Sequence, residues 1–320
     1  MLSAVLGVGV LAPWTALGPA AAKLTPADSP TAGIGGDIAF QSARAGKGCC
    51  RIFTMQANGT DVRSPLPTVS PSYDPAWSPD GSKLAFASFA HRNNFEIYVA
   101  EARPGAPGPR LSILTHDKSR DSSPAWSPDG QRLAFVSDRA GSYDVWRMDS
   151  NGDNEVDLSG NAANDCGCFE PFFVFAQPAY SPDGSKIAST SDLADPGNNL
   201  DVFTMDADGS HVQRLTSNAA VDAEADWSRD GREIAFASGR DGDLEIFVMN
   251  ADGSGPASLT RNGATDTQPD WSPDGARFAF TSDRDGNPEI YVMRSDGSRQ
   301  HNITHNPAID ERPDWRPTGG

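Results

Sequence analysis

The sequence predicts an all-β fold, a six-bladed β-propeller of four-stranded antiparallel blades, and three observations support this. First, a Trp-Ser-Pro-Asp-Gly block recurs at intervals of 49, 54, 47, 44 and 44 residues, close to the repeat length of propeller blades. Second, each interval holds four short apolar segments. Third, the incomplete units at the two ends of the chain complete each other. The copies of the block begin at Trp77, Trp126, Tyr180, Trp227, Trp271 and, truncated, Trp315.

The unit from Asp266 to Thr304 shows the expected elements in order. A first strand ends at Trp271, and a Ser-Pro-Asp-Gly turn reverses the chain, since Pro fits early turn positions and Gly tolerates positive φ. Residues 277–282 then alternate as a half-buried strand does. After a polar connection, a third strand covers 289–293, and an Asp-Gly hairpin leads into the fourth strand.

Counting the second strand of each unit gives six blades. These segments are 38–40, 84–86, 133–135, 187–189, 234–236 and 278–280. The first has no Trp strand before it, and the C-terminal segment 312–315 has no second strand after it. We therefore predict that the C-terminal strand joins the N-terminal strands, which removes the exposed edges that an open array would present.

These segments resemble the TolB-type β-propeller, whose repeats carry Trp-Ser-Pro-Asp-Gly, Leu-Ala-Phe-x-Ser and Glu-Ile-Tyr-Val-Met-x-x-Asp-Gly-Ser. The resemblance covers residues 36–317. TolB itself is a periplasmic partner of an outer-membrane lipoprotein, and it carries an α/β domain ahead of its propeller. Here about 35 residues precede the first expected strand. The resemblance thus implies the propeller fold and an extracytoplasmic, periplasmic or secreted, binding protein.

Residues 1–35 are predicted to form a leader with a flexible linker, ahead of a propeller over 36–317. Leu2–Leu17 has the length of a signal-peptide core, and Ala20–Ala22 offers small residues for cleavage. The alternative is a retained transmembrane anchor, although Pro13 and Pro19 interrupt a segment barely long enough to span a bilayer.

The composition of the 320-residue chain excludes some partners. Its formal net charge is -17, and its isoelectric point is about 4.6. Nucleic acids and anionic lipids are bound by clustered Lys and Arg, and the sequence contains no basic run. We predict a monomer that binds a protein or cell-envelope component, without nucleic acid and without stable membrane insertion after cleavage.

Four cysteines fit an exported protein and offer three pairings. They are Cys49, Cys50, Cys166 and Cys168. The first pair falls on the first blade and the second on a Phe-rich insert, 161–177, before the fourth blade's second strand. A cross-link over the central opening, local strained bridges and free thiols all remain open. A thiolate metal site is a weaker alternative, because neither pair has Cys-x-x-Cys spacing.

An acidic series recurs five positions before the aromatic marker, where the innermost strands begin. It comprises Asp121, Asp222, Asp266 and Asp310. We predict that this series rings the mouth of the central channel, where it would bind a divalent cation such as calcium or a basic partner. The alternative is that each Asp caps its own loop by hydrogen bonding to backbone amides. A second acidic register lies one position before the marker, at Asp226, Asp270 and Asp314.

Further charged residues are expected to form ion pairs within each blade. Acidic residues open the third strands at Glu96, Asp144, Asp201, Glu245 and Glu289. Arginines lie four or five positions earlier at Arg92, Arg139, Arg240 and Arg284. We predict that these arginines pair with the acids that follow them, with little energetic contribution at an exposed surface.

Few features of the sequence indicate an enzyme. No Gly-x-Ser-x-Gly nucleophile elbow is present. His116 and His305 both follow a fourth-strand Thr and are expected near the channel mouth. Some propellers that resemble this chain are polysaccharide lyases that use His and a divalent metal there. The leading hypothesis is therefore a noncatalytic scaffold that requires no cofactor and binds through its acidic loop-rich face. The alternative is a metal-dependent, polyuronate-lyase-like enzyme.

Overall fold

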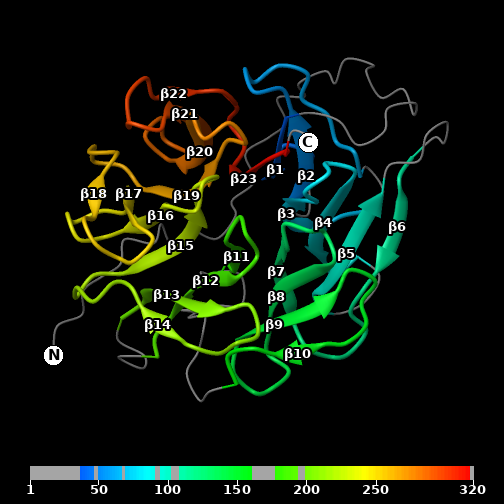
Figure 1. Cartoon of the computed structure of the whole chain (residues 1–320). Coiled ribbons are helices and arrows are strands. Elements are labelled where there is room, and N and C mark those ends of the chain that lie inside the picture. The colour runs from blue at the N-terminus through cyan, green and yellow to red at the C-terminus, as the bar shows by residue number, and fades with distance from the viewer. Residues whose placement is uncertain are drawn as a thin grey trace, which may run out of the picture. The chain divides into compact units, whose positions relative to one another are not determined.

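A computed structural model describes residues 37–46, 50–66, 69–90, 94–101, 108–160, 177–193 and 199–317. In these ranges the chain forms β-strands, turns and bends, and no helix. The strands assemble into six antiparallel sheets arranged as blades around a centre, which confirms the predicted propeller (Figure 1). None of the described residues forms a helix that is long and apolar enough to span a membrane.

The blades are numbered here from the one that contains the first strand of the chain. Blade 1 contains β23 (Asp310–Trp315), β1 (Ile38–Ser42) and β2 (Arg51–Met55). Blade 2 contains β3 (Ser72–Trp77), β4 (Lys83–Ser88), β5 (Glu96–Glu101) and β6 (Arg110–Ile113). Blade 3 contains β7 (Asp121–Trp126), β8 (Arg132–Ser137), β9 (Asp144–Asp149) and β10 (Val156–Asp157). Blade 4 contains β11 (Ala179–Tyr180), β12 (Lys186–Ser191), β13 (Asp201–Asp206) and β14 (Gln213–Arg214). Blade 5 contains β15 (Asp222–Trp227), β16 (Glu233–Ser238), β17 (Glu245–Asn250) and β18 (Ala257–Ser258). Blade 6 contains β19 (Asp266–Trp271), β20 (Arg277–Ser282), β21 (Glu289–Arg294) and β22 (His301–Asn302).

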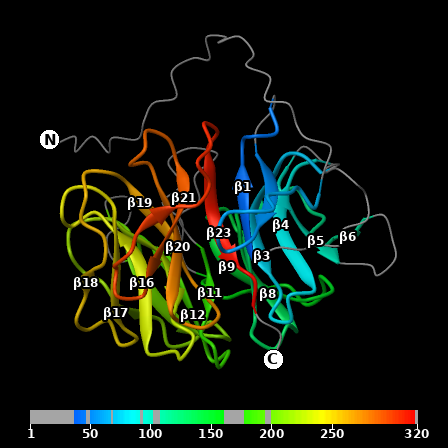
Figure 2. The same ribbon diagram turned by 90° about the horizontal axis from the view of Figure 1, so that it is seen from above.

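The ring closes in blade 1, where strands from the two ends of the chain pair. The C-terminal β23 runs antiparallel to β1, and Ile38 lies opposite Trp315 in the register. On its other side β1 pairs with β2. Figure 2 shows β23 beside β1 at the junction. An isolated bridge between Thr54 and Arg63 occupies the position of a fourth strand. The predicted closure by the C-terminal strand is therefore confirmed.

The core consists of six apolar clusters, one between each pair of neighbouring blades. In one of them Ala85 and Ile97 of blade 2 pack with Trp126 and Phe135 of blade 3. The cluster that joins the two ends of the array packs Phe40 of blade 1 against residues of blade 6. Because every blade buries both faces against neighbours, closing the ring buries apolar surface that an open array would expose.

The repeated Ser-Pro-Asp-Gly turns are self-contained hydrogen-bonded units. In the first copy, the Ser78 hydroxyl donates to Asp80 at 2.6 Å and accepts from the backbone N–H of Lys83 at 2.9 Å. The bond from the Ser78 hydroxyl, followed by the bond from the Ser82 amide, lowers the pKa of Asp80 to about 2. The following Gly81 has φ of +65°, a conformation that residues with a Cβ adopt only with strain. Local bonding thus explains why this turn is copied from blade to blade.

The hairpins between third and fourth strands hold neighbouring blades at close range. Gly209 has φ of +90°, and a Cβ built on it would lie 2.4 Å from the carbonyl oxygen of Leu158 in the preceding blade. That distance is too short for any side chain, so this hairpin position requires glycine. The Asp-Gly pair predicted as a hairpin signal therefore also sets the spacing between blades.

Candidate functional site

The acidic rim series begins the inner strands, as its spacing predicted. Asp121, Asp222, Asp266 and Asp310 each open an inner strand, and each is 0% exposed. Every one accepts a bond from an arginine in the loop between the second and third strands of its own blade. The pairs are Asp121 with Arg139, Asp222 with Arg240, Asp266 with Arg284 and Asp310 with Arg44.

The guanidinium groups of these pairs also rest on aromatic rings. The Cζ atom of Arg284 lies 4.5 Å from the ring centre of Tyr291 and 5.6 Å from that of Phe280. Arg240 lies in the same way over Phe236 and Phe247. Each rim aspartate therefore faces a cation that is already held by cation–π contacts.

Burial raises the pKa of Asp121 and of Asp310, while the charges of Arg139 and Arg44 oppose that rise. An arginine within hydrogen-bond distance stabilises the ionised carboxylate against desolvation. The arrangement resembles a buried ion pair inside each blade more than an open ring of charge. That the rim binds calcium or a basic partner stays a prediction.

The predicted partners of the loop arginines are wrong in the described blades. Arg139, Arg240 and Arg284 pair with the acids that open the first strands, and not with those that open the third. Arg92 lies outside the described residues. The prediction chose the acid that is nearer in sequence. In the structure, antiparallel pairing places the start of the first strand beside the end of the second strand, and the loop that carries the arginine follows directly.

The acids that open the third strands have a different role, which is to fix the end of the fourth strand. The Thr115 hydroxyl donates to Glu96 at 2.8 Å and accepts from the backbone N–H of Ile97 at 2.9 Å. Thr216 bonds to Asp201 at 3.1 Å in the same way. These acids thus belong to the architecture of the blades.

His116 and His305, the histidines predicted at the channel mouth, are both exposed. Within the described ranges, no three His, Cys, Asp or Glu side chains gather in a geometry that could hold a metal ion. Their catalytic or binding roles stay predictions.

The cysteine and leader predictions lie mostly outside the described part of the chain. Cys50 is described and is 8% exposed. Cys49, Cys166 and Cys168 lie outside the described residues, as do residues 1–36. The disulfide pairing and the leader with its linker therefore stay predictions.

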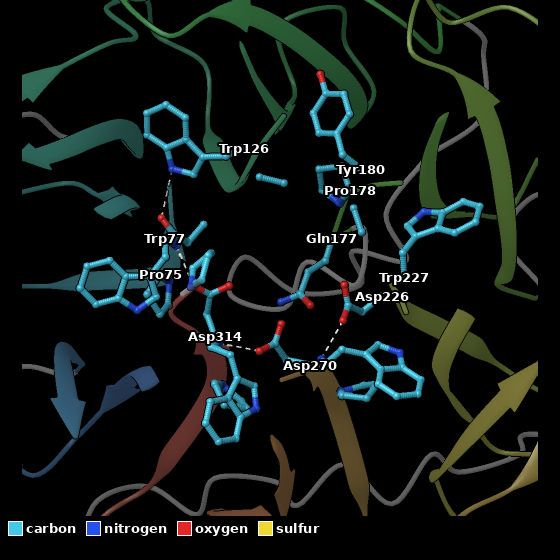
Figure 3. Close-up of a pocket in the computed structure, with 18 of the residues that line it drawn as sticks. Pro75, Trp77, Trp126, Gln177, Pro178, Tyr180, Asp226, Trp227, Asp270 and Asp314 are labelled. Carbon is cyan, nitrogen blue, oxygen red and sulfur yellow. Dashed lines mark hydrogen bonds between the residues drawn. The ribbon is translucent and has the colours of Figure 1, made fainter. Parts of the chain in front are cut away.

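A cavity of about 620 Å³ lies along the propeller axis, lined by the inner strands of all six blades and by the prolines of the Ser-Pro-Asp-Gly turns. Figure 3 shows the aromatic markers around it. The four rim aspartates do not line this cavity. They begin the inner strands, whereas the cavity is lined from the third residue of these strands, such as Gln268 and Arg312, to the aromatic markers at their ends.

Three carboxylates of the second acidic register line the cavity: Asp226, Asp270 and Asp314. Each accepts a hydrogen bond from the backbone N–H of the Trp in the next blade. The distances are 2.9 Å from Trp271 to Asp226, 2.6 Å from Trp315 to Asp270 and 2.7 Å from Trp77 to Asp314. These bonds join blades 5, 6, 1 and 2 in sequence.

The pKa values of these carboxylates are raised. Burial raises the pKa of Asp226 to about 7. Burial, with the charge of Asp226, raises that of Asp314 to about 8. Burial, followed by the charges of both neighbours, raises that of Asp270 well above its usual range. For all three groups desolvation is the largest cause, because burial disfavours the charged carboxylate.

Deeper in the channel, bulged residues of the inner strands form a polar belt that the sequence analysis missed. Asp74, Ser123, Glu224, Gln268 and Arg312 have φ between +50° and +58°, a region costly for residues other than Gly. They bond around the ring. Asp74 accepts from the Ser123 amide at 3.2 Å, Glu224 from the Gln268 amide at 2.9 Å, and Gln268 from the Arg312 amide at 2.9 Å.

A signal for this belt was present in the sequence. Three positions before each aromatic marker stands a polar residue, from Asp74 in the first copy to Arg312 in the last. The periodicity of a regular strand gives no reason to expect a bulge there. A register shift within the inner strand turns these side chains toward the axis in five of the six described blades, as between Tyr73 and Ala76.

The fold and the axial cavity define a class, the six-bladed propellers whose repeats surround a central channel. The family model for the TolB beta propeller domain matches residues 23–171, 170–255 and 238–320. The chain therefore belongs to the TolB β-propeller domain family.

Individual relatives agree with this assignment. An uncharacterized protein of Agrobacterium fabrum is 31% identical over 174 residues, which are 52% of this chain and 54% of the relative. The Tol-Pal system protein TolB of Anaeromyxobacter dehalogenans is 48% identical over 48 residues, or 15% of this chain and 10% of that protein. The chain thus spans about half the length of the first relative and a tenth of the second.

Among solved structures, TolB from Acinetobacter baumannii superposes with a TM-score of 0.73 at 22% identity. The match covers 88% of this chain and 66% of that one. At this identity the likeness supports the fold.

Proposed function

We propose that this protein is an exported, noncatalytic scaffold that binds a protein or cell-envelope component at the central channel. The observation that carries the proposal is the axial cavity of about 620 Å³, to which all six inner strands contribute. Its size falls in the range of ligand sites, and sites where many elements converge are favoured for binding. The relationship to TolB propellers supports an extracytoplasmic location and a protein partner.

The rim of acidic residues at the starts of the inner strands is less suited to bind the partner. Its aspartates are compensated by arginines of their own blades, so they offer little free charge to a partner. The carboxylates at the other end of the inner strands line the cavity without such cations. We therefore place the binding site at the channel end formed by the Ser-Pro-Asp-Gly turns.

Site-specific photo-crosslinking tests the proposal. A photoreactive amino acid replaces Arg229, which is exposed at this channel mouth, or Asn151, which is exposed on an outer hairpin. Each variant is irradiated in envelope extract of the producing cell. We expect a discrete crosslinked partner from position 229 and none from position 151. Crosslinking at 151 with none at 229 would place binding on the outer surface and contradict the proposal.

A further inference from the structure

The axial cavity has two unlike walls. One position before the aromatic marker, blades 5, 6 and 1 carry Asp226, Asp270 and Asp314. At the same position, blades 2, 3 and 4 carry Ala76, Ala125 and Ala179. At this position the channel is therefore acidic on three consecutive blades and apolar on the other three, where Pro75, Pro124 and Pro178 also line it. Two positions earlier, the same three blades line the cavity with Asp74, Ser123 and Gln177.

The acidic wall is rigidly held and still has free bonding capacity. The hydrogen bonds from the Trp amides use one oxygen, Oδ2, of each carboxylate. Figure 3 shows the three carboxyl groups directed into the central space, toward which Gln177 also extends from blade 4. A carboxylate can accept about four hydrogen bonds, so each of these groups can accept more.

The protein itself supplies little positive charge to this wall. In the described part of the chain, no Lys, Arg or His nitrogen lies within 4.0 Å of a carboxylate oxygen of Asp226, Asp270 or Asp314. Of the residues that the structure describes, two arginines line the cavity: Arg312 forms an ion pair with Asp74 at 3.1 Å, and Arg229 is exposed at the cavity mouth. The charge of Asp226 raises the pKa of both Asp270 and Asp314, so the three acids lie close together, and among the described residues none of them forms an ion pair.

We propose that the cavity receives a basic side chain, lysine or arginine, of a protein partner that enters between the Ser-Pro-Asp-Gly turns. The inference rests on the proposed function and adds the chemistry of recognition. An ammonium or guanidinium group supplies three or five N–H donors for the oxygens of the acidic wall. The aliphatic stem of the same side chain packs against the Ala and Pro wall, as such stems do on apolar surfaces.

Binding by this route is linked to protons. Carboxyl groups with raised pKa values are partly protonated at neutral pH, and a cation favours their ionised form. Binding of the partner's basic side chain therefore releases protons from the carboxyl groups. The affinity of the cavity for that side chain increases as the pH rises from about 6 to about 9. Further charged groups on the neighbouring inner strands and turns are Asp74, Glu224, Glu311, Arg312 and Arg229. Asp74 and Arg312 compensate each other.

Calorimetry with acetyl-arginine-amide and its uncharged isostere acetyl-citrulline-amide provides the test. The test variant combines Asp226→Asn, Asp270→Asn and Asp314→Asn, each of which keeps an acceptor for the Trp amide. The matched control combines Asp208→Asn, Asp252→Asn and Asp296→Asn, exposed hairpin positions with the same change in charge. We expect the arginine amide to bind the wild type and the control, about tenfold or more weaker binding to the test variant, and no binding of the citrulline amide.

Proton release, measured in buffers of different ionisation enthalpy, is expected from the wild type and not from the test variant. Equal binding of the two amides, or equal binding by test and control variants, would overturn the inference. Absence of arginine-amide binding at millimolar concentration would overturn it too. If the partner crosslinked at position 229 is still captured in that case, the proposed function stands without this inference. If the amide binds and no crosslink forms at 229, the proposed function fails instead.

Discussion

Arg312 and Asp74 form an ion pair across the closure of the ring, with Arg312 Nε 3.1 Å from Asp74 Oδ1. Arg312 belongs to the C-terminal β23, and Asp74 lies in β3 of the adjacent blade. The side chains are 10% and 13% exposed. The same junction contains the bond from the Trp77 amide to Asp314 and the contact of the Arg316 guanidinium with the Trp77 ring, 5.0 Å from its centre. Polar contacts therefore reinforce the closure where the chain ends meet.

Breaking this pair should destabilise the whole ring. For Arg312→Ala we expect the free energy of unfolding to fall by about 3 kcal/mol, because Asp74 remains buried without its cation. The comparison variant is Arg232→Ala, whose pair with Asp230 is 85% and 59% exposed. We expect a much smaller loss there, because solvent screens an exposed ion pair. Chemical denaturation measures both, and equal losses would show that the closure pair has no special role.

The aromatic markers should stabilise the interfaces between blades. Trp126 is 8% exposed, packs in the cluster between blades 2 and 3, and donates from Nε1 to the Ala76 carbonyl at 3.1 Å. We expect Trp126→Ala to cost about 3 to 5 kcal/mol through lost burial and a cavity. Trp126→Phe, which keeps an aromatic ring, should cost clearly less. Thermal unfolding distinguishes them, and an unchanged melting temperature for the Ala variant would contradict this packing role.

The rim aspartates should be needed for folding stability. Asp222 is 0% exposed and accepts two bonds from Arg240 at 3.1 Å. We expect Asp222→Asn to lower the free energy of unfolding by about 1 to 3 kcal/mol, since a neutral amide leaves the guanidinium uncompensated.

Calorimetric titration with calcium tests whether the rim also binds a cation. The wild type is compared with the double variant that combines Asp266→Asn and Asp310→Asn. A calcium heat in the wild type that disappears in the double variant would establish the rim as a cation site.

The cavity carboxyl groups should make stability decrease with rising pH. In the unfolded chain an Asp ionises near pH 3.8, whereas the folded values are about 7 for Asp226 and about 8 for Asp314. Between these limits the folded state binds more protons than the unfolded state, so the free energy of unfolding falls as the pH rises from about 4 to about 8. Below that window both states are protonated, and above it both are ionised.

The variant with Asn at 226, 270 and 314 lacks these groups and isolates their effect. We expect the difference in the free energy of unfolding between this variant and the wild type to change across that window. Denaturation at several pH values measures it. A difference that is constant from about pH 4 to about pH 8 would show that the carboxyl groups titrate normally in the folded protein.

The sequence by itself determined the repeat, the number of blades and the closure. These depend on local signals: Ser-Pro-Asp-Gly turns bond within themselves, and alternating apolar residues define strands wherever they occur. It also placed the four rim aspartates at the starts of inner strands. It did not reveal their partners, because Arg139 and Asp121 meet only when antiparallel strands pair.

Only the tertiary structure decided the character of the channel. In sequence, Asp226, Asp270 and Asp314 are separate residues 44 positions apart, and their grouping in three consecutive blades says nothing about their surroundings. Ring closure brings Asp314 beside blade 2, and register shifts within the inner strands turn the bulged residues toward the axis. Burial and mutual repulsion then raise the pKa values of these acids, because desolvation depends on the neighbours that the ring assembles.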